Sequence, residues 1–223
     1  MNKLITILAL MVASLGFSAA NAGQFGLGVS GSIAAVDAVG TEVDKDGTAD
    51  TSVRKATAGN NAMLGSIFAE YSFDNGITLG IDHIPGSADV NNSTLTRTDD
   101  SSEAAQDGDR SANATIDNHM TYYVELPIHA GLYLKAGMLE MDVNSNESDT
   151  VTTAGSYGGT SVDGEMFGFG YKNTFGERGF YKVEATKRTY DTITLNSTTS
   201  DKGNKITADV DATLATFALG FNF

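Results

Sequence analysis

Three histidines, His83, His119 and His129, are the ordinary candidates for general-base chemistry in this chain of 223 residues, which contains no cysteine. Asp82 precedes His83 and Ser87 follows it, so these residue types are those of an acid, base and nucleophile triad. Adjacent residues of a strand point to opposite faces, however, and Asp82 and His83 would then be separated. We therefore expect no catalytic residues and no enzymatic activity.

One acidic segment has the residue types of a cation-binding loop. Asp44, Asp46 and Asp50 alternate with other residues around Gly47, and alternating carboxylates near a glycine can wrap a hard cation. The full EF-hand pattern is missing, so the three aspartates are a divalent-cation candidate only. No glycine cluster joins a strand to a helix, and we expect no cofactor.

Eight more charged residues alternate with apolar residues, which places them on the polar faces of extended segments. Four are acids and four are bases, so this set is neutral although the whole chain carries −14. Charges in a closed interior are tolerated only when they are paired and hydrogen-bonded. We therefore expect these residues to form one charge network: Glu70, Asp82, Glu125, Lys135, Lys172, Lys182, Glu184 and Arg188.

The elements that must position this network are strands, because apolar residues recur with period two from Gln24 onward and no helical stripe is sustained. The last strand shows this most clearly, with Phe217, Leu219, Phe221 and Phe223 on one face. The pattern predicts eight strands: Gln24–Val36, Ala62–Phe73, Ile77–Ile84, His119–Pro127, Leu132–Val143, Ser161–Lys172, Phe180–Asp191 and a final strand that ends at Phe223.

The connections between these strands alternate strictly between long and short. The long ones, 37–61, 85–118, 144–160 and 192–206, are rich in polar residues, and the first two carry much of the excess acid. An up-and-down barrel in a membrane places short turns at one end and long loops at the other. We therefore expect an all-β, eight-stranded antiparallel up-and-down transmembrane β-barrel whose long acidic loops are solvated and mobile.

The first 22 residues predict an export signal, with Lys3, an apolar run and the sequence Ala20-Asn21-Ala22 at the end. The predicted organisation is a signal peptide over 1–22 and a barrel domain over 23–223. The acidic net charge argues against nucleic-acid binding, and no nucleic-acid partner is expected.

These features together resemble the small outer-membrane β-barrels of Gram-negative bacteria, the OmpA-like and OmpX-like eight-stranded group. The resemblance rests on the signal, the first strand Gln24-Phe25-Gly26-Leu27-Gly28-Val29, and the terminal strand ending Phe217-Ala218-Leu219-Gly220-Phe221-Asn222-Phe223. In that group the terminal apolar positions, here Phe217, Leu219, Phe221 and Phe223, are the signal for the barrel-assembly machinery. The resemblance implies export through the periplasm to the outer membrane.

The expected function is a structural or cell-surface interaction role through the long acidic loops, in a monomer whose partners are outer-membrane lipid and lipopolysaccharide. Three alternatives stay open. One is a narrow porin-like channel for ions or small solutes, which needs a continuous aqueous path. Another is a lipid-modifying outer-membrane enzyme, and the third is a secreted soluble β-sandwich, in which the apolar faces would meet in the middle.

Overall fold

The structure, a computed structural model, describes residues 23–46, 50–89, 95–99, 108–149, 157–198 and 204–223. The predicted signal peptide over 1–22 therefore lies outside the described residues. All regular structure in the described part is β-strand, in one antiparallel sheet: β1 (Gln24–Asp46), β2 (Asp50–Ser72), β3 (Thr78–Ile84), β4 (Ala88–Asp89), β5 (Leu95–Asp99), β6 (Gly108–His129), β7 (Leu132–Asp149), β8 (Gly159–Phe175), β9 (Gly179–Tyr190), β10 (Ile193–Asn196) and β11 (Lys205–Asn222).

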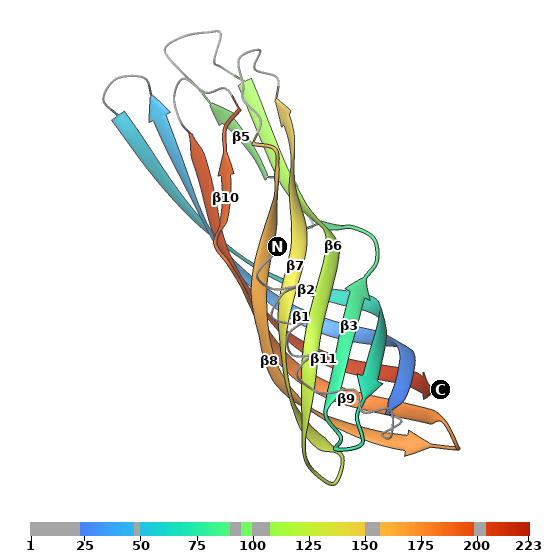
Figure 1. Ribbon diagram of the computed structural model, residues 1–223. Helices are drawn as coiled ribbons and strands as arrows, with labels where there is room; N and C mark the ends of the chain where they lie inside the picture. The colour runs from blue at the N-terminus through green and yellow to red at the C-terminus, as the bar shows by residue number, and fades with distance from the viewer. Residues whose placement is uncertain (1–22, 47–49, 90–94, 100–107, 150–156, 199–203) are drawn as a thin grey trace.

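Eight of these strands close into a ring in the order β1, β2, β3, β6, β7, β8, β9 and β11 (Figure 1). The ring is closed by β1 and β11, which pair from Gly26 with Asn222 to Val43 with Lys205. The backbone N–H of Phe223 also donates to the carbonyl of Phe25 over 2.8 Å. The expected eight-stranded up-and-down barrel is confirmed, and no helix of the described residues is long and apolar enough to cross a membrane.

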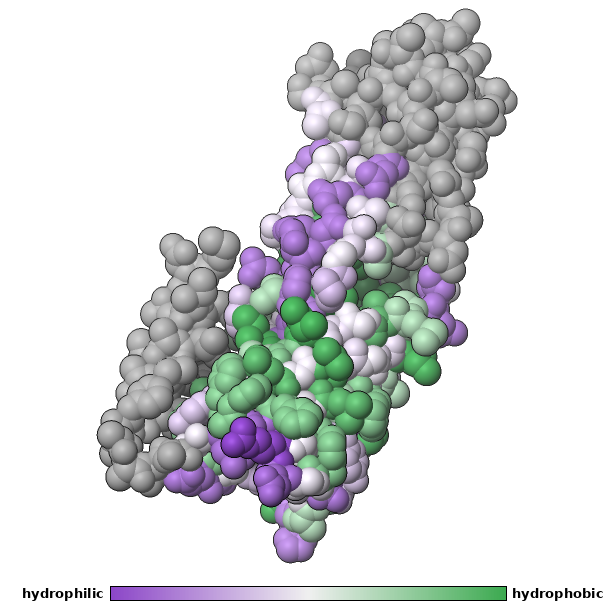
Figure 2. All heavy atoms as spheres, turned by 90° about the vertical axis from the view of Figure 1, so that its right-hand side faces the viewer, coloured by the Kyte–Doolittle hydropathy of each residue, from purple (hydrophilic) through white to green (hydrophobic). Residues whose placement is uncertain are grey.

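Large apolar side chains cover the outside of the barrel near the short turns. They form the apolar band, which is exposed to the surroundings and includes Phe25, Leu27, Val29, Ile33, Met63, Ile67, Leu132, Leu134, Phe167, Phe169, Val183, Phe217, Leu219 and Phe221. Figure 2 shows this apolar region on one face, with hydrophilic side chains above and below it. An outward apolar belt between polar ends is what a bilayer requires of a barrel. The phenylalanines and leucines of the terminal strand therefore do not meet in the centre of a soluble sandwich.

Farther along the same strands the two faces exchange character. On β7, outward positions change from Leu134 to Asp142, and inward positions change from Lys135 to Met141 and Val143. The inward residues of this second region form a packed apolar cluster, the extension core: Met141, Val143, Val162, Ile193, Leu195 and Val210. We call the part of the barrel around this cluster the extension. Its apolar side chains face inward and its polar side chains outward, as in a protein surrounded by water.

The sequence predicted loops over 37–61, 85–118, 144–160 and 192–206. This prediction is wrong where the structure extends the strands into these segments. Strand β1 continues to Asp46 and β2 starts at Asp50, so most of 37–61 is a paired hairpin. Similarly, β6 begins at Gly108 and β7 runs to Asp149. The polar composition misled the prediction, because strands that leave the membrane expose polar residues outward and need only a narrow inward apolar face to remain a sheet.

One tight turn and the early end of one strand shape the ring. Ala130 and Gly131 both have positive φ values, 50° and 85°, as a two-residue type I′ hairpin requires between β6 and β7. Strand β3 ends at Ile84 because Pro85 lacks an N–H and Gly86 turns the chain at φ 87°. Strand β2 pairs with β3 only over 67–72, so within the described residues the edge of 53–66 that faces away from β1 has no strand partner.

Candidate functional site

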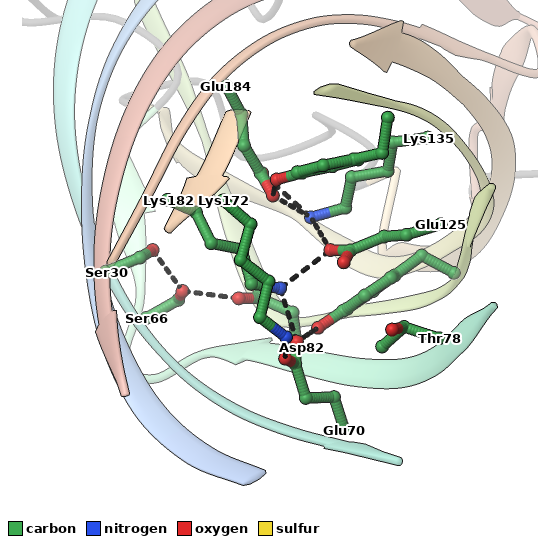
Figure 3. A network of polar contacts seen from close by, with 12 residues as sticks. Ser30, Ser66, Glu70, Thr78, Asp82, Glu125, Lys135, Lys172, Lys182 and Glu184 are labelled. Carbon is green, nitrogen blue, oxygen red and sulfur yellow. Dashed lines mark hydrogen bonds and ion pairs between the residues drawn. The ribbon is translucent and has the colours of Figure 1, made fainter. Parts of the chain in front are cut away.

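The lumen of the barrel, at the level of the apolar band, holds an alternating chain of six charged side chains (Figure 3). This ion-pair chain runs Lys172, Glu70, Lys182, Glu125, Lys135 and Glu184. The Nζ atom of Lys172 lies 2.7 Å from Glu70 Oε1, and that of Lys182 lies 2.6 Å from Glu125 Oε1 and also contacts Glu70. At the other end, Lys135 Nζ lies 2.8 Å from Glu184 Oε2 and 3.8 Å from Glu125 Oε1.

Five strands supply the six members of the ion-pair chain, so the sheet must close before the charges can meet. Lys182 is 1% exposed and Glu70 and Glu125 are each 2% exposed. A buried charge is tolerable only when its partners replace the lost water. Each acid of the chain has at least one lysine partner, and each lysine has at least one acid, which makes the lumen a neutral plug.

Two tyrosines complete the plug from the barrel wall. The hydroxyl of Tyr133 donates to Glu184 Oε1 over 2.6 Å, and that of Tyr123 donates to Glu70 Oε2 over 3.0 Å. Tyr123 also places its ring beneath Lys135, with Nζ 4.0 Å from the ring centroid. Each hydroxyl is therefore a second donor to a carboxylate oxygen that also accepts from a lysine, and the Tyr123 ring faces the Lys135 ammonium group.

Glycines on neighbouring strands make room for these two rings. A Cβ atom at Gly170 would lie 2.4 Å from the ring of Tyr133, and one at Gly80 would lie 2.1 Å from the ring of Tyr123. Both distances are far below a possible contact between carbon atoms. The inward glycines of β3 and β8 therefore belong to the plug, because they let the tyrosines reach across the pleat to the glutamates.

The other two predicted network members, Asp82 and Arg188, are in the lumen but outside the ion-pair chain. Asp82 accepts a hydrogen bond of 2.6 Å from Ser66, which in turn shares one of 2.7 Å with Ser30. Arg188 is 8% exposed and its Nη1 lies 3.4 Å from His119 Nε2. Six of the eight predicted residues therefore form one chain of ion pairs, whereas Asp82 and Arg188 lie in the lumen without joining it.

The histidines do not assemble a triad. The carboxylate of Asp82 bonds Ser66, while Nδ1 of His83 is buried without a hydrogen-bond partner in the structure. His119 lies in the lumen, where its Nε2 and the Tyr190 hydroxyl are 2.9 Å apart. This pair caps the polar part of the lumen below the extension core.

The remaining predicted residues lie on the outer wall or at the hairpin end. Phe217, Leu219, Phe221 and Phe223 are exposed on the band, between 44% and 69%. The backbone of Asp44, Asp46 and Asp50 lies at the end of β1 and the start of β2, and residues 47–49 between them are outside the described residues. The suggestion of a cation site there stays a prediction.

Comparison with solved structures places this architecture among known barrels. The outer membrane protein OprG from Pseudomonas aeruginosa aligns with a TM-score of 0.53 and 12% identity, over 91% of this chain and 97% of OprG. The chain has the fold of a small outer-membrane β-barrel. Ail of Yersinia pestis aligns with a TM-score of 0.41 and 12% identity over 90% of this chain and 99% of Ail, and the Escherichia coli protease OmpT with 0.43 and 10% over 90% and 97%.

At these identities the likeness of the barrel to solved structures is one of fold. No family model matches the barrel sequence. No curated protein sequence matches it either. The role of this outer-membrane barrel therefore has to be argued from its own side chains.

Proposed function

We propose that this outer-membrane β-barrel is a closed, monomeric barrel that carries a rigid sheet platform into the space outside the cell. The observation that carries this proposal is the extension core. Met141 is 1% exposed, Val143 3% and Val162 4%, although these residues lie beyond the apolar band. A packed apolar cluster holds the strands together where no membrane does, and a platform for surface contacts needs that rigidity.

The orientation of the platform follows from the barrel class. The described ends of the chain, near Gln24 and Phe223, lie at the short-turn end of the ring. Barrels of this class keep short turns in the periplasm and longer segments outside. The acidic outward face of the extension, with residues such as Asp142, would then meet the phosphate-rich outer leaflet and solvent, where lipopolysaccharide is the proposed partner through divalent cations.

The ion-pair chain argues against the rival role of a porin-like channel. An ion path needs continuous water, and the buried Glu70, Lys182 and Glu125 cross the lumen in direct contact. Single-channel recording of the purified barrel in planar bilayers tests the closed lumen, with no steady steps expected. Regular conductance steps would overturn the proposal.

The surface platform is tested on intact cells. We expect an external protease to leave the hairpin of β1 and β2 uncut in the wild-type barrel and to cut it when Val143→Asp disrupts the extension core. A matched change at an exposed position, Val39→Asp, should leave the protection intact. Cutting of the wild-type hairpin at the same rate as in the Val143 variant would show that the extension is not a rigid platform.

We also propose that the chain is not an enzyme and that its terminal strand is read by the barrel-assembly machinery. The first proposal is supported by the separation of Asp82, which faces Ser66, from the His83 ring. Incubation of the refolded barrel with lipid A or peptide substrates, with His83→Ala as the comparison, should give no product. The second is tested by Phe223→Ala, which should slow barrel assembly in cells.

A further inference from the structure

The extension consists of two half-sheets that face each other across the extension core. One half-sheet contains β10 and the outer parts of β2, β1 and β11, and the other contains the outer parts of β8, β7 and β6. Each half-sheet supplies three of the six core residues: Ile193, Leu195 and Val210 from the first, and Met141, Val143 and Val162 from the second. Apolar packing therefore holds the two half-sheets together, as it does the sheets of a β-sandwich.

Strand β10 is the least firmly held strand that contributes to this core. Its four residues pair with β11 alone, from Ile193 with Ala208 to Asn196 with Lys205. On its other side lies β8, and within the described residues no ladder joins these two strands (Figure 1). By contrast, β1 is paired along both edges as far as Val43. A short ladder on one edge is typical of a segment that opens locally.

A β-bulge separates β10 from β9 and aims the side chains of β10 inward. Between the pair Thr189–Asp211 and the pair Ile193–Ala208, the chain advances four residues on one side (189 to 193) and three on β11 (211 to 208). The extra residue reverses the parity of the strand. Buried inward positions are even-numbered on β9, as at Arg188, and odd-numbered on β10. The bulge therefore places two apolar side chains in the extension core that would otherwise face outward.

The bulge has the contacts of a hinge. Asp191 and Thr192 lie between the two strands and are exposed. The N–H of Asp191 donates to the carbonyl of Asp163 on β8 over 2.8 Å, and the hydroxyl of Thr192 donates to Asp209 Oδ1 over 2.7 Å. Both contacts lie at the base of β10. The strand beyond them is held by its short ladder and by its two core side chains.

We propose that β10 is a hinged strap that opens on this bulge and releases the extension core toward β8, while the ring of eight strands stays closed. Opening withdraws two of the three core residues of its half-sheet, Ile193 and Leu195. The two half-sheets then lose much of the packing between them. The facing part of β8, 159–163, pairs with β7 but not with β9, so no other strand covers the core on this side. The strap goes beyond the role of a platform, because it concerns how the extension opens.

The first test measures hydrogen exchange of the folded full-length barrel in detergent micelles. We expect the amides of Ile193–Asn196 to exchange at least about tenfold faster than those of 36–43 on β1. Both segments belong to the extension, but the segment of β1 is paired on both edges. The comparison therefore separates opening of the strap from opening of the whole extension.

A disulfide that locks the strap sharpens this test, since the chain contains no cysteine of its own. Thr194→Cys with Thr207→Cys joins β10 to β11 at directly opposed positions. Its oxidised form should slow exchange of the strap at least about tenfold relative to its reduced form. The matched control is Thr41→Cys with Thr207→Cys, which joins β11 to β1 instead and should leave the exchange of the strap unchanged.

A single cysteine shows whether opening of the strap reaches the core. Val162 is 4% exposed in the extension core, and Leu214 is 2% exposed on β11, where it is paired with β1 and β9. We expect Val162→Cys to react with a water-soluble thiol reagent at least about tenfold faster than Leu214→Cys, because the ring does not open with the strap.

Several outcomes would overturn the proposal. Exchange of β10 as slow as that of β1 would show that the strap does not open, and an oxidised lock without effect would mean that exchange does not depend on separation of β10 from β11. Equal reactivity of the two single cysteines would make opening a property of the whole barrel. Fast exchange of β10 with an unreactive cysteine in the Val162 variant would reduce the strap to a frayed strand. The first comparison uses the wild-type barrel, so it stands even where a variant fails to fold.

Discussion

The membrane-level part of the barrel and its extension are built from the same strands, but their apolar and polar faces are exchanged. At the level of the apolar band, Leu134 faces outward and Lys135 inward; a few residues later Asp142 faces outward and Met141 inward. The strand geometry is unchanged, so the surrounding solvent decides which face is apolar. Stability at the membrane level should therefore depend on ion pairs, and stability of the extension on apolar packing.

The largest effect is expected from removing the central lysine of the ion-pair chain. Lys182→Met leaves Glu70 and Glu125 short of a partner in a buried site. We expect a loss of about 3–5 kcal/mol in the free energy of unfolding, measured by urea titration in detergent with gel mobility as the readout. Lys187→Met is the control, because its pair with Asp211 is exposed and worth less than about 1 kcal/mol. Equal losses of stability in the Lys182 and Lys187 variants would show that lumenal ion pairs stabilise the barrel no more than ion pairs on the outer wall.

The second test compares two methionines. Met141 is 1% exposed in the extension core and Met63 is 88% exposed on the band. We expect Met141→Ala to cost about 2–5 kcal/mol through the cavity it leaves. Its effect should appear as faster proteolysis of the extension, while Met63→Ala should stay within about 0.5 kcal/mol of the wild-type barrel. An unchanged extension in the Met141 variant would mean that the core does not hold it.

A smaller loss in the free energy of unfolding is expected at a glycine that makes room for a tyrosine ring of the plug. Gly170→Ala places a methyl group against the Tyr133 ring, and overpacking of this kind costs about 1–3 kcal/mol. Gly31→Ala on β1 is the matched control, because a Cβ there meets no atom within 4 Å. The two variants are compared by thermal unfolding in detergent. A neutral result at Gly170 would show that the tyrosine can move without cost.

The smallest effect is a pH dependence in the extension. Hydrogen bonds from Asn118 (3.0 Å) and Ser161 (2.7 Å) hold the pKa of Asp142 below its ordinary value. Because the pKa of Asp142 is lower in the folded state, its ionised carboxylate stabilises the fold at pH values above the ordinary pKa. This stabilisation is lost as the pH falls through the folded-state pKa. NMR titration of the Asp142 carboxyl carbon should show the low pKa, and Ser161→Ala should raise it. A carboxyl that titrates at or above its ordinary pKa would contradict this reading.

The strand pattern near the short turns could be predicted because period-two alternation is strong there, from Phe217 to Phe223 for instance. The strands of the extension were not predicted from the sequence. Their apolar residues occupy the opposite face from those at the membrane level, and polar residues surround them. The signal was present: on β7 the apolar residues change parity between Met138 and Leu139. This change of parity indicates that the strand continues past Met138 and that its other face becomes apolar.

The sequence by itself determined the two-faced strands and the neutral set of lumenal charges, since both are properties of residue type and spacing along one chain. It did not determine which acid meets which base. Glu70 and Lys172 are 102 residues apart and lie 2.7 Å from each other only because the ring closes. The position of Asp82 and Arg188 outside this chain was likewise decided by the tertiary structure, because the diameter and stagger of a closed sheet set which side chains reach across it.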